Sequence, residues 1–176
     1  MYEPQEDSYL LLKCVKKYCK DKVLDLGCGS GILSEEALKY SKDVLSVDVN
    51  SEVVKYCKEK GLNVRQSDLF SNVKEKFDLI IFNPPYLPEK ELEKRETSAV
   101  VSGGKKGYEI IERFLEQIKE HLTENGKVLL LFSSLTNKEK IDSLISKNNL
   151  KFKLIEEEKL FFEKLYVYLI FENEKN

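Results

Sequence analysis

The sequence contains no tryptophan, a single histidine and no pair of cysteines at C-x-x-C spacing. The histidine is His121, and the four cysteines are Cys14, Cys19, Cys28 and Cys57. A protein zinc site usually takes four ligands from closely spaced cysteines and histidines. We therefore expect no metal site in this chain, and we expect reduced cysteines rather than a disulfide framework.

Long apolar runs and an excess of positive charge are also missing. No apolar stretch approaches the roughly 20 residues of a membrane-spanning helix, and the opening residues MYEPQEDSYLLLK lack the features of a signal peptide. We expect a soluble, cytoplasmic protein. Lys+Arg (29) nearly balances Asp+Glu (31), for a net charge of -2. Proteins that bind duplex phosphates usually carry a basic excess, so a nucleic-acid partner is disfavoured.

Short apolar runs alternate with helical patterns along the chain. The length fits one domain, and we assign 1–176 to it, with 1–20 as an N-terminal helical extension. The alternation predicts an α/β fold: a Rossmann-like, doubly wound, mostly parallel seven-stranded sheet with helices on both faces and an antiparallel C-terminal hairpin. The expected strands are 22–26, 44–49, 62–65, 77–82, 127–132, 152–162 and 165–171, and the expected helices cover 2–19, 30–40, 51–60, 107–122 and the region of 141–145.

The segment 87–106 departs from this regular pattern. It is charged, contains no clear helix or strand pattern, and ends in Ser102-Gly103-Gly104-Lys105-Lys106-Gly107. Loops of such length are uncommon in compact domains and are often functional. We predict that this segment closes over a substrate.

A glycine-rich turn follows the first expected strand and opens the next helix. It reads Asp25-Leu26-Gly27-Cys28-Gly29-Ser30-Gly31. Glycines let the backbone approach a ligand, and the helix N-terminus offers free N–H groups. Nicotinamide enzymes use G-x-G-x-x-G, whereas this turn reads G-x-G-x-G after an acid. It resembles the first motif of the Rossmann-like methyltransferases, whose cofactor is S-adenosylmethionine; a turn that binds no ligand is the alternative.

Two more acids follow the next two expected strands. Asp48 ends the second strand, where a carboxylate accepts hydrogen bonds from ribose hydroxyls, although an acid there is also a common helix cap. Asp68 follows the third strand and suits the adenine amino group, although aspartate also forms turns. Because the carboxyl ends of parallel strands meet at one edge, Asp25, Asp48 and Asp68 point to one nucleoside site.

The fourth expected strand ends in Asn83-Pro84-Pro85-Tyr86. The prolines fix the backbone and remove two N–H donors, which leaves the Asn83 side-chain carbonyl and the Pro84 backbone carbonyl as acceptors. An –NH₂ group can donate to both, while Tyr86 offers a flat surface for a base or an amide. The segment predicts methylation of a planar nitrogen by positioning, with no strong base; a plain proline turn is the alternative.

Across nearly its full length the chain resembles the archaeal and eukaryotic branch of the HemK-type release-factor glutamine methyltransferases. The opening Tyr2-Glu3-Pro4-Gln5-Glu6-Asp7-Ser8-Tyr9 is similar to the Y-E-P-x-E-D-[ST]-[FY] segment of that branch, and Gly103 to Glu109 is similar to its G-G-x-x-G-x-E segment. The resemblance implies methylation of the glutamine of a Gly-Gly-Gln motif in a class-1 peptide chain release factor. It also implies a small zinc-binding activator protein as partner. At matching positions it implies acceptor contacts from Asn83, Pro84, Pro85 and Tyr86, and cofactor contacts from Ser8, Asp25, Gly27, Gly29, Gly31, Asp48, Asp68, Leu69 and Asn83.

Three other functions fit parts of the pattern. Adenine-N6 methyltransferases of DNA or RNA share the N-P-P-Y motif, but the near-neutral charge and the lack of a target-recognition domain favour glutamine. A lysine methyltransferase would need a base to deprotonate the ammonium, and none is evident. A noncatalytic cofactor-binding scaffold would have no need of the acceptors of Asn83 and Pro84.

Overall fold

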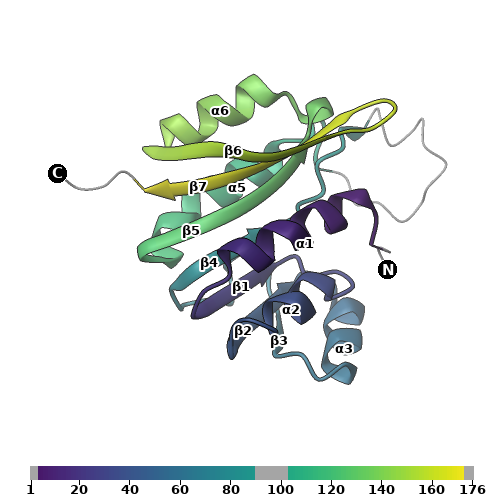
Figure 1. The fold of residues 1–176 in the computed structure, drawn as a ribbon, viewed down its shortest axis with the longest axis vertical. Coiled ribbons are helices and arrows are strands. Elements are labelled where there is room, and N and C mark those ends of the chain that lie inside the picture. Colours follow the sequence, from purple (N-terminus) through teal and green to yellow (C-terminus); the bar gives the residue numbers. More distant parts are fainter. Residues whose placement is uncertain (1–3, 90–102, 173–176) are drawn as a thin grey trace.

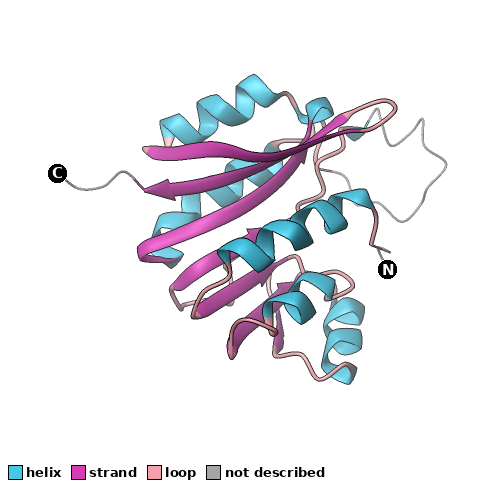
Figure 2. Cartoon of the chain, viewed as in Figure 1, coloured by secondary structure: helices cyan, strands magenta, loops and turns pink. Residues whose placement is uncertain are grey.

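In the computed structural model, residues 4–89 and 103–172 are described, and they build a seven-stranded sheet with helices on both faces (Figures 1 and 2). The strand order is β3-β2-β1-β4-β5-β7-β6, in which β1 to β5 pair in parallel and β7 pairs antiparallel with both β5 and β6. This confirms the predicted fold class. The strands are β1 Lys22–Leu26, β2 Asp43–Asp48, β3 Val64–Gln66, β4 Phe77–Phe82, β5 Leu122–Ser133, β6 Leu150–Lys159 and β7 Lys164–Glu172.

The helices separate into two layers. Figure 1 shows α1 (Glu6–Tyr18) and α2 (Ile32–Ala37) in front of the sheet and α5 (Glu109–Gln117) behind it. Alternate residues of each central strand enter the two cores, since successive side chains of a strand point to opposite faces. In β4, Leu79 and Ile81 pack with α1 and α2, while Ile80 and Phe82 pack with α5 and α6 (Lys138–Lys147).

Helix α3 (Ser51–Glu59) lies against β2 and β3 and shows why the local sequence folds as it does. Its first turn is capped by Asn50, whose side-chain oxygen accepts a hydrogen bond from the Glu52 backbone N–H at 2.9 Å. Its end is followed by Gly61, whose φ of +82° is a left-handed conformation that glycine adopts without strain. The helix was expected over 51–60 and spans Ser51–Glu59 in the structure.

Several predicted boundaries differ from the structure, among them those of β5, β6 and α5. The strand expected over 152–162 ends at Lys159, because 160–163 form the turn of the β6–β7 hairpin. The strand expected to begin at 127 begins at Leu122. The helix expected over 107–122 ends at Gln117 and continues as a 3₁₀ turn over Ile118–His121. In the segment 87–106, residues 90–102 lie outside the described residues. Within the described ranges, no helix is both long and apolar enough to cross a bilayer.

Candidate active site

The predicted site residues come together at the carboxyl ends of β1, β2 and β4. Leu26 at the end of β1 is in register with Val47 of β2 and Phe82 of β4. The glycine turn after Leu26, Asp48 at the end of β2 and Asn83 after β4 therefore lie on one edge of the sheet. Ligands of open α/β sheets bind at this edge.

The glycine turn is folded against β2. The backbone N–H groups of Gly27 and Cys28 donate to the Val47 carbonyl, at 2.8 and 3.0 Å. Gly27, Gly29 and Gly31 all have positive φ, of +71°, +51° and +78°. A Cβ on Gly29 would meet no atom within 4 Å, so this position faces open space. The turn thus exposes backbone where a ligand can approach closely.

Gly31 is explained by packing as well as by conformation. A Cβ there would lie 2.6 Å from Leu62 Cδ1 and 3.3 Å from Cys57 Sγ. The absence of a side chain lets the start of α2 lie directly against the small apolar cluster beneath α3, which includes Cys57 and Leu62. The part that Gly31 plays in cofactor binding stays a prediction.

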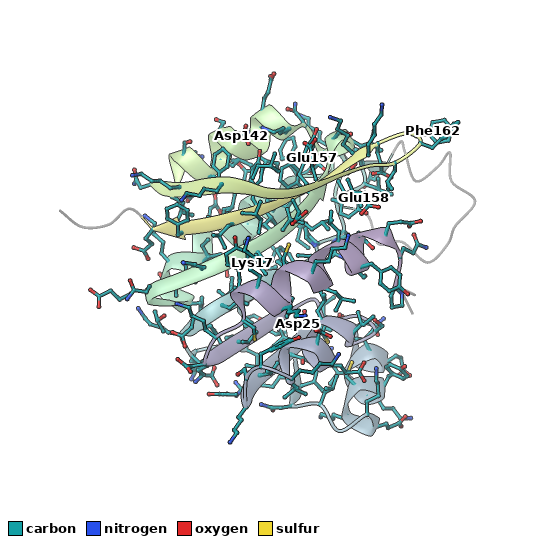
Figure 3. The ribbon with its side chains drawn as sticks, viewed as in Figure 1. Lys17, Asp25, Asp142, Glu157, Glu158 and Phe162 are labelled. Carbon is teal, nitrogen blue, oxygen red and sulfur yellow. The ribbon has the colours of Figure 1, made fainter. Side chains whose placement is uncertain are left out.

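Asp25, labelled in Figure 3, is completely buried. Its Oδ2 accepts a hydrogen bond from Ser34 Oγ at 2.6 Å, and Ser34 Oγ also lies 2.7 Å from Ser46 Oγ. Its Oδ1 is one of two buried side-chain polar atoms in the described ranges that have no hydrogen-bond partner. Burial raises the pKa of Asp25 to about 6, against the lowering effect of the Ser34 hydrogen bonds.

Asp48 connects the glycine turn to the end of β2. Its Oδ2 accepts from the Gly29 N–H at 3.1 Å, and its Oδ1 accepts from the Asn50 N–H at 2.9 Å. The side chain that caps α3 is that of Asn50, so the helix-cap alternative considered for Asp48 does not apply. Asp48 orients the turn and remains at the edge where a ribose would bind.

The turn after β3 carries Asp68 and Leu69. Asp68 Oδ2 forms an ion pair with Arg113 of α5 at 2.8 Å, and both side chains are about half exposed. Leu69 is buried with φ of +49°, an uncommon conformation for a branched residue. Such strained positions often occur at ligand sites. Ser67 Oγ stabilises the turn by donating to the Leu69 carbonyl at 2.7 Å.

Asp7, in the first turn of α1, is the residue that sequence reasoning did not assign to the site. It is buried, and its Oδ2 accepts from Asn83 Nδ2 at 3.0 Å and from the Tyr86 hydroxyl at 3.4 Å. Ser8 is also buried, and its backbone N–H donates to Asp7 Oδ1 at 2.6 Å. Helix α1 thus contributes a carboxylate that holds the side chain of Asn83.

Because Asp7 binds the amide nitrogen of Asn83, the amide oxygen must point elsewhere. Asn83 Oδ1 is the second buried side-chain atom in the described ranges that has no hydrogen-bond partner. Buried acceptors are nearly always satisfied in folded proteins. This free acceptor agrees with the hypothesis that Asn83 receives an N–H of the substrate.

The backbone of Pro85 and Tyr86 is held by the glycines of the G-G-x-x-G segment. A Cβ on Gly103 would lie 2.5 Å from the Pro85 carbonyl oxygen, and one on Gly107 would lie 2.6 Å from that of Tyr86. Thr136 Oγ1 donates to the same Tyr86 oxygen at 2.9 Å. The segment therefore fixes the backbone of Pro85 and Tyr86 by close approach, a structural reason for its glycines.

The site does not favour Cys28 as a nucleophile. Burial raises the pKa of the Cys28 thiol far above its ordinary value, and nearby Asp25 adds to the effect. A thiol in that state is a poor nucleophile. Across residues 4–89 and 103–172, no group of three potential metal ligands comes together.

The residues at this edge fit S-adenosylmethionine. The open space at Gly29 accommodates a ligand beside the turn, and Asp25 Oδ1 is an acceptor that lacks a donor. Asp48 and Asp68 carry carboxylates, which could accept hydrogen bonds from ribose hydroxyls and an adenine amino group. Gly27, Gly29, Asp25, Asp48, Asp68 and Leu69 would hold the cofactor.

Comparisons with known proteins agree with this geometry. The model of the family described as "Methyltransferase small domain" matches residues 3–162. A Methanocaldococcus jannaschii protein named "Putative protein N5-glutamine methyltransferase" is 39% identical over 95% of this chain and 89% of its own length. A release factor glutamine methyltransferase of Borreliella burgdorferi is 35% identical over 62% of this chain, but over only 43% of its own length.

Among solved structures, the E. cuniculi Mtq2–Trm112 complex, described as methylating the translation termination factor eRF1, superposes with a TM-score of 0.79. The identity is 26%, and the match covers 98% of both chains. The fold, the glycine turn and these relatives lead to one conclusion. The chain belongs to the methyltransferase small domain family, and its cofactor is S-adenosylmethionine.

Proposed function

We propose that this chain methylates the side-chain amide nitrogen of the glutamine in a Gly-Gly-Gln motif of a class-1 peptide release factor. The observation that carries the proposal is the fixed amide of Asn83. Its nitrogen is bound by Asp7, and its buried oxygen has no partner in the described ranges. The site therefore presents an acceptor to the substrate, as the recognition of an –NH₂ group requires.

These residues act mainly by positioning the acceptor nitrogen of the substrate. The bound cofactor supplies a methyl group on a sulfonium, and the acceptor nitrogen must approach it in line. A hydrogen bond from the substrate to Asn83 Oδ1, and a second to the Pro84 carbonyl, would orient the nitrogen lone pair towards that methyl group. Alignment of this kind lowers a barrier by about 7–11 kcal/mol at best. As the N–C bond to the methyl group forms and the C–S bond breaks, the nitrogen becomes strongly acidic and loses one proton to solvent, so no strong general base is required.

The adenine alternative uses the same acceptors, and the charge around them argues against it. Asp7 is buried at the site, and Glu6 and Glu163 line the cavity beside it. Nucleic-acid sites are lined by lysine and arginine, because each phosphate carries a negative charge. The lining favours a polypeptide substrate over DNA or RNA.

A small partner protein also belongs to the proposal. The similar Mtq2 chain is found in a complex with Trm112, and we propose that this chain forms a heterodimer with a small zinc-binding activator. The zinc would belong to the activator, since the described residues of this chain offer no metal site. We place the reaction in the cytoplasm, where translation terminates.

Mass spectrometry of a candidate release factor after reaction tests the proposal directly. We expect one methyl group on the glutamine of its Gly-Gly-Gln motif, and none in DNA or RNA supplied in parallel. Asn83→Ala should still bind the cofactor by calorimetry and lose nearly all turnover. Methylation of nucleic acid alone would refute the choice of glutamine, and unchanged turnover of Asn83→Ala would refute the role of its amide.

A further inference from the structure

Two phenylalanines project from the tip of the β6–β7 hairpin. Phe161 is 92% exposed and Phe162 is 81% exposed, and Figure 3 shows Phe162 pointing away from the body of the molecule. Their rings form an edge-to-face pair with centroids 4.7 Å apart. Large exposed apolar groups that cluster usually mark an interaction surface.

The tip is held in place by hydrogen bonds. Within the turn, the Leu160 N–H donates to the Glu163 carbonyl at 2.8 Å. Ser133 Oγ, at the end of β5, donates to the Glu163 carboxylate at 2.5 Å, and the Lys164 N–H donates to Ser134 Oγ at 3.0 Å. An aromatic pair on a fixed turn loses little conformational entropy when a partner binds.

The tip shares a cavity with the catalytic residues. The cavity has a volume of about 480 Å³, within the range of ligand pockets. One wall is the hairpin turn with Leu165, and the other is the start of α1 together with Tyr86. The described residues that line it are Gln5, Glu6, Asp7, Tyr86, Leu160, Phe161, Phe162, Glu163 and Leu165.

We infer that this cavity and its phenylalanine tip bind the polypeptide segment that flanks the methylated residue. The inference rests on the proposed function and adds the surface by which the protein substrate is recognised. Because Tyr86 and Asp7 belong both to the cavity and to the catalytic site, a chain whose amide reaches Asn83 passes along this wall. The β6–β7 hairpin supplies the apolar contacts for that polypeptide segment.

The lining indicates the chemistry of that segment. Three of the described lining residues are acidic and none is basic. A segment with an apolar side chain for the phenylalanines and a lysine or arginine near Glu6 fits best, since Asp7 and Glu163 already accept hydrogen bonds within the protein. The rings can also bind a cation over their faces.

The double variant Phe161→Ala/Phe162→Ala tests the inference. Truncated aromatic anchors weaken interfaces strongly, so we expect KM for the release factor to rise at least about tenfold. We expect kcat to change less than about twofold and cofactor affinity by calorimetry to stay the same, because neither ring belongs to the cofactor site. The matched control is Leu154→Ala, which removes a half-exposed side chain from β6 outside the cavity. It should leave KM unchanged.

The other outcomes of these measurements would contradict either the docking surface or the proposed function. An unchanged KM in the double variant, or an equal rise in Leu154→Ala, would overturn the docking surface while the methylated glutamine still supports the proposed function. A change of oligomeric state between wild type and double variant would assign the tip to self-association and overturn it too. Failure of the wild-type chain to methylate a release factor would refute the proposed function itself, and with it the occupant assigned to the cavity.

Discussion

The buried carboxylate of Asp25 makes stability depend on pH in a direction unusual for an aspartate. Burial raises the pKa of Asp25 from its ordinary 3.8 to about 6. The folded chain therefore holds this proton more tightly than the unfolded chain does. The cost of burying the charged carboxylate is absent below pH 3.8, develops as the pH rises towards 6, and is complete above it.

Asp25→Asn replaces the carboxylate with a neutral group of the same shape. The difference between a pKa of 3.8 and one of about 6 corresponds to about 3 kcal/mol, at about 1.36 kcal/mol for each pH unit. By linkage, about 2 kcal/mol of this develops between about pH 4.5 and about pH 7.5. The free energy of unfolding of Asp25→Asn, minus that of wild type, should rise by that amount across the range. A constant effect of the substitution cancels in this comparison.

Urea unfolding of both proteins without cofactor, at a series of pH values, measures the difference. Ser34→Ala is the companion variant, because it removes the hydroxyl that donates to Asp25 and lowers its pKa. In that variant the pH-dependent loss of stability should move to higher pH. A difference between Asp25→Asn and wild type that is constant from about pH 4.5 to about pH 7.5 would refute the reasoning.

Three further substitutions test the glycine turn and the first turn of α1. Gly31→Ala should lower the free energy of unfolding by about 1–3 kcal/mol because its Cβ collides with Leu62. Gly29→Ala, with open space at its Cβ, should cost only about 1–2 kcal/mol for its positive φ but weaken cofactor binding measured by calorimetry. Asp7→Ala frees the amide of Asn83 to rotate, so kcat should fall about 100-fold while cofactor binding persists; unchanged kcat would contradict the role of Asp7.

The architecture was predictable because each element carries a strong local signal. Strand β4 is almost entirely apolar, as a strand covered on both faces must be. The end of β6 was predicted wrongly because Phe161 and Phe162 continue an apolar pattern, although they lie in the turn and face solvent. Hydrophobicity alone does not distinguish a buried strand residue from an exposed binding residue.

The sequence predicts those site residues that belong to a local motif. It does not predict Asp7, whose place in the site depends on tertiary packing. The glycine turn and Asn83 follow strands, so their meeting at one edge follows from a parallel sheet. Asp7 lies 76 residues from Asn83 in the sequence, and only the packing of α1 on the sheet brings them together. One signal was present: Asp7 shares a helical face with the buried residues Leu10, Leu11 and Cys14. An acid on a buried face needs a polar partner.

Two unsatisfied acceptors in one small region are difficult to explain by folding alone. Asp25 lies within β1 and Asn83 directly follows the neighbouring strand β4. Apart from Asp25 Oδ1 and Asn83 Oδ1, no buried side-chain polar atom of residues 4–89 and 103–172 lacks a partner. Each such atom costs about 1–3 kcal/mol. A cofactor-binding scaffold would account for Asp25 beside the glycine turn. It would not by itself explain why Asp7 binds the Asn83 nitrogen while the buried Asn83 oxygen has no partner among the described residues, an arrangement that supports the proposed binding of a substrate N–H.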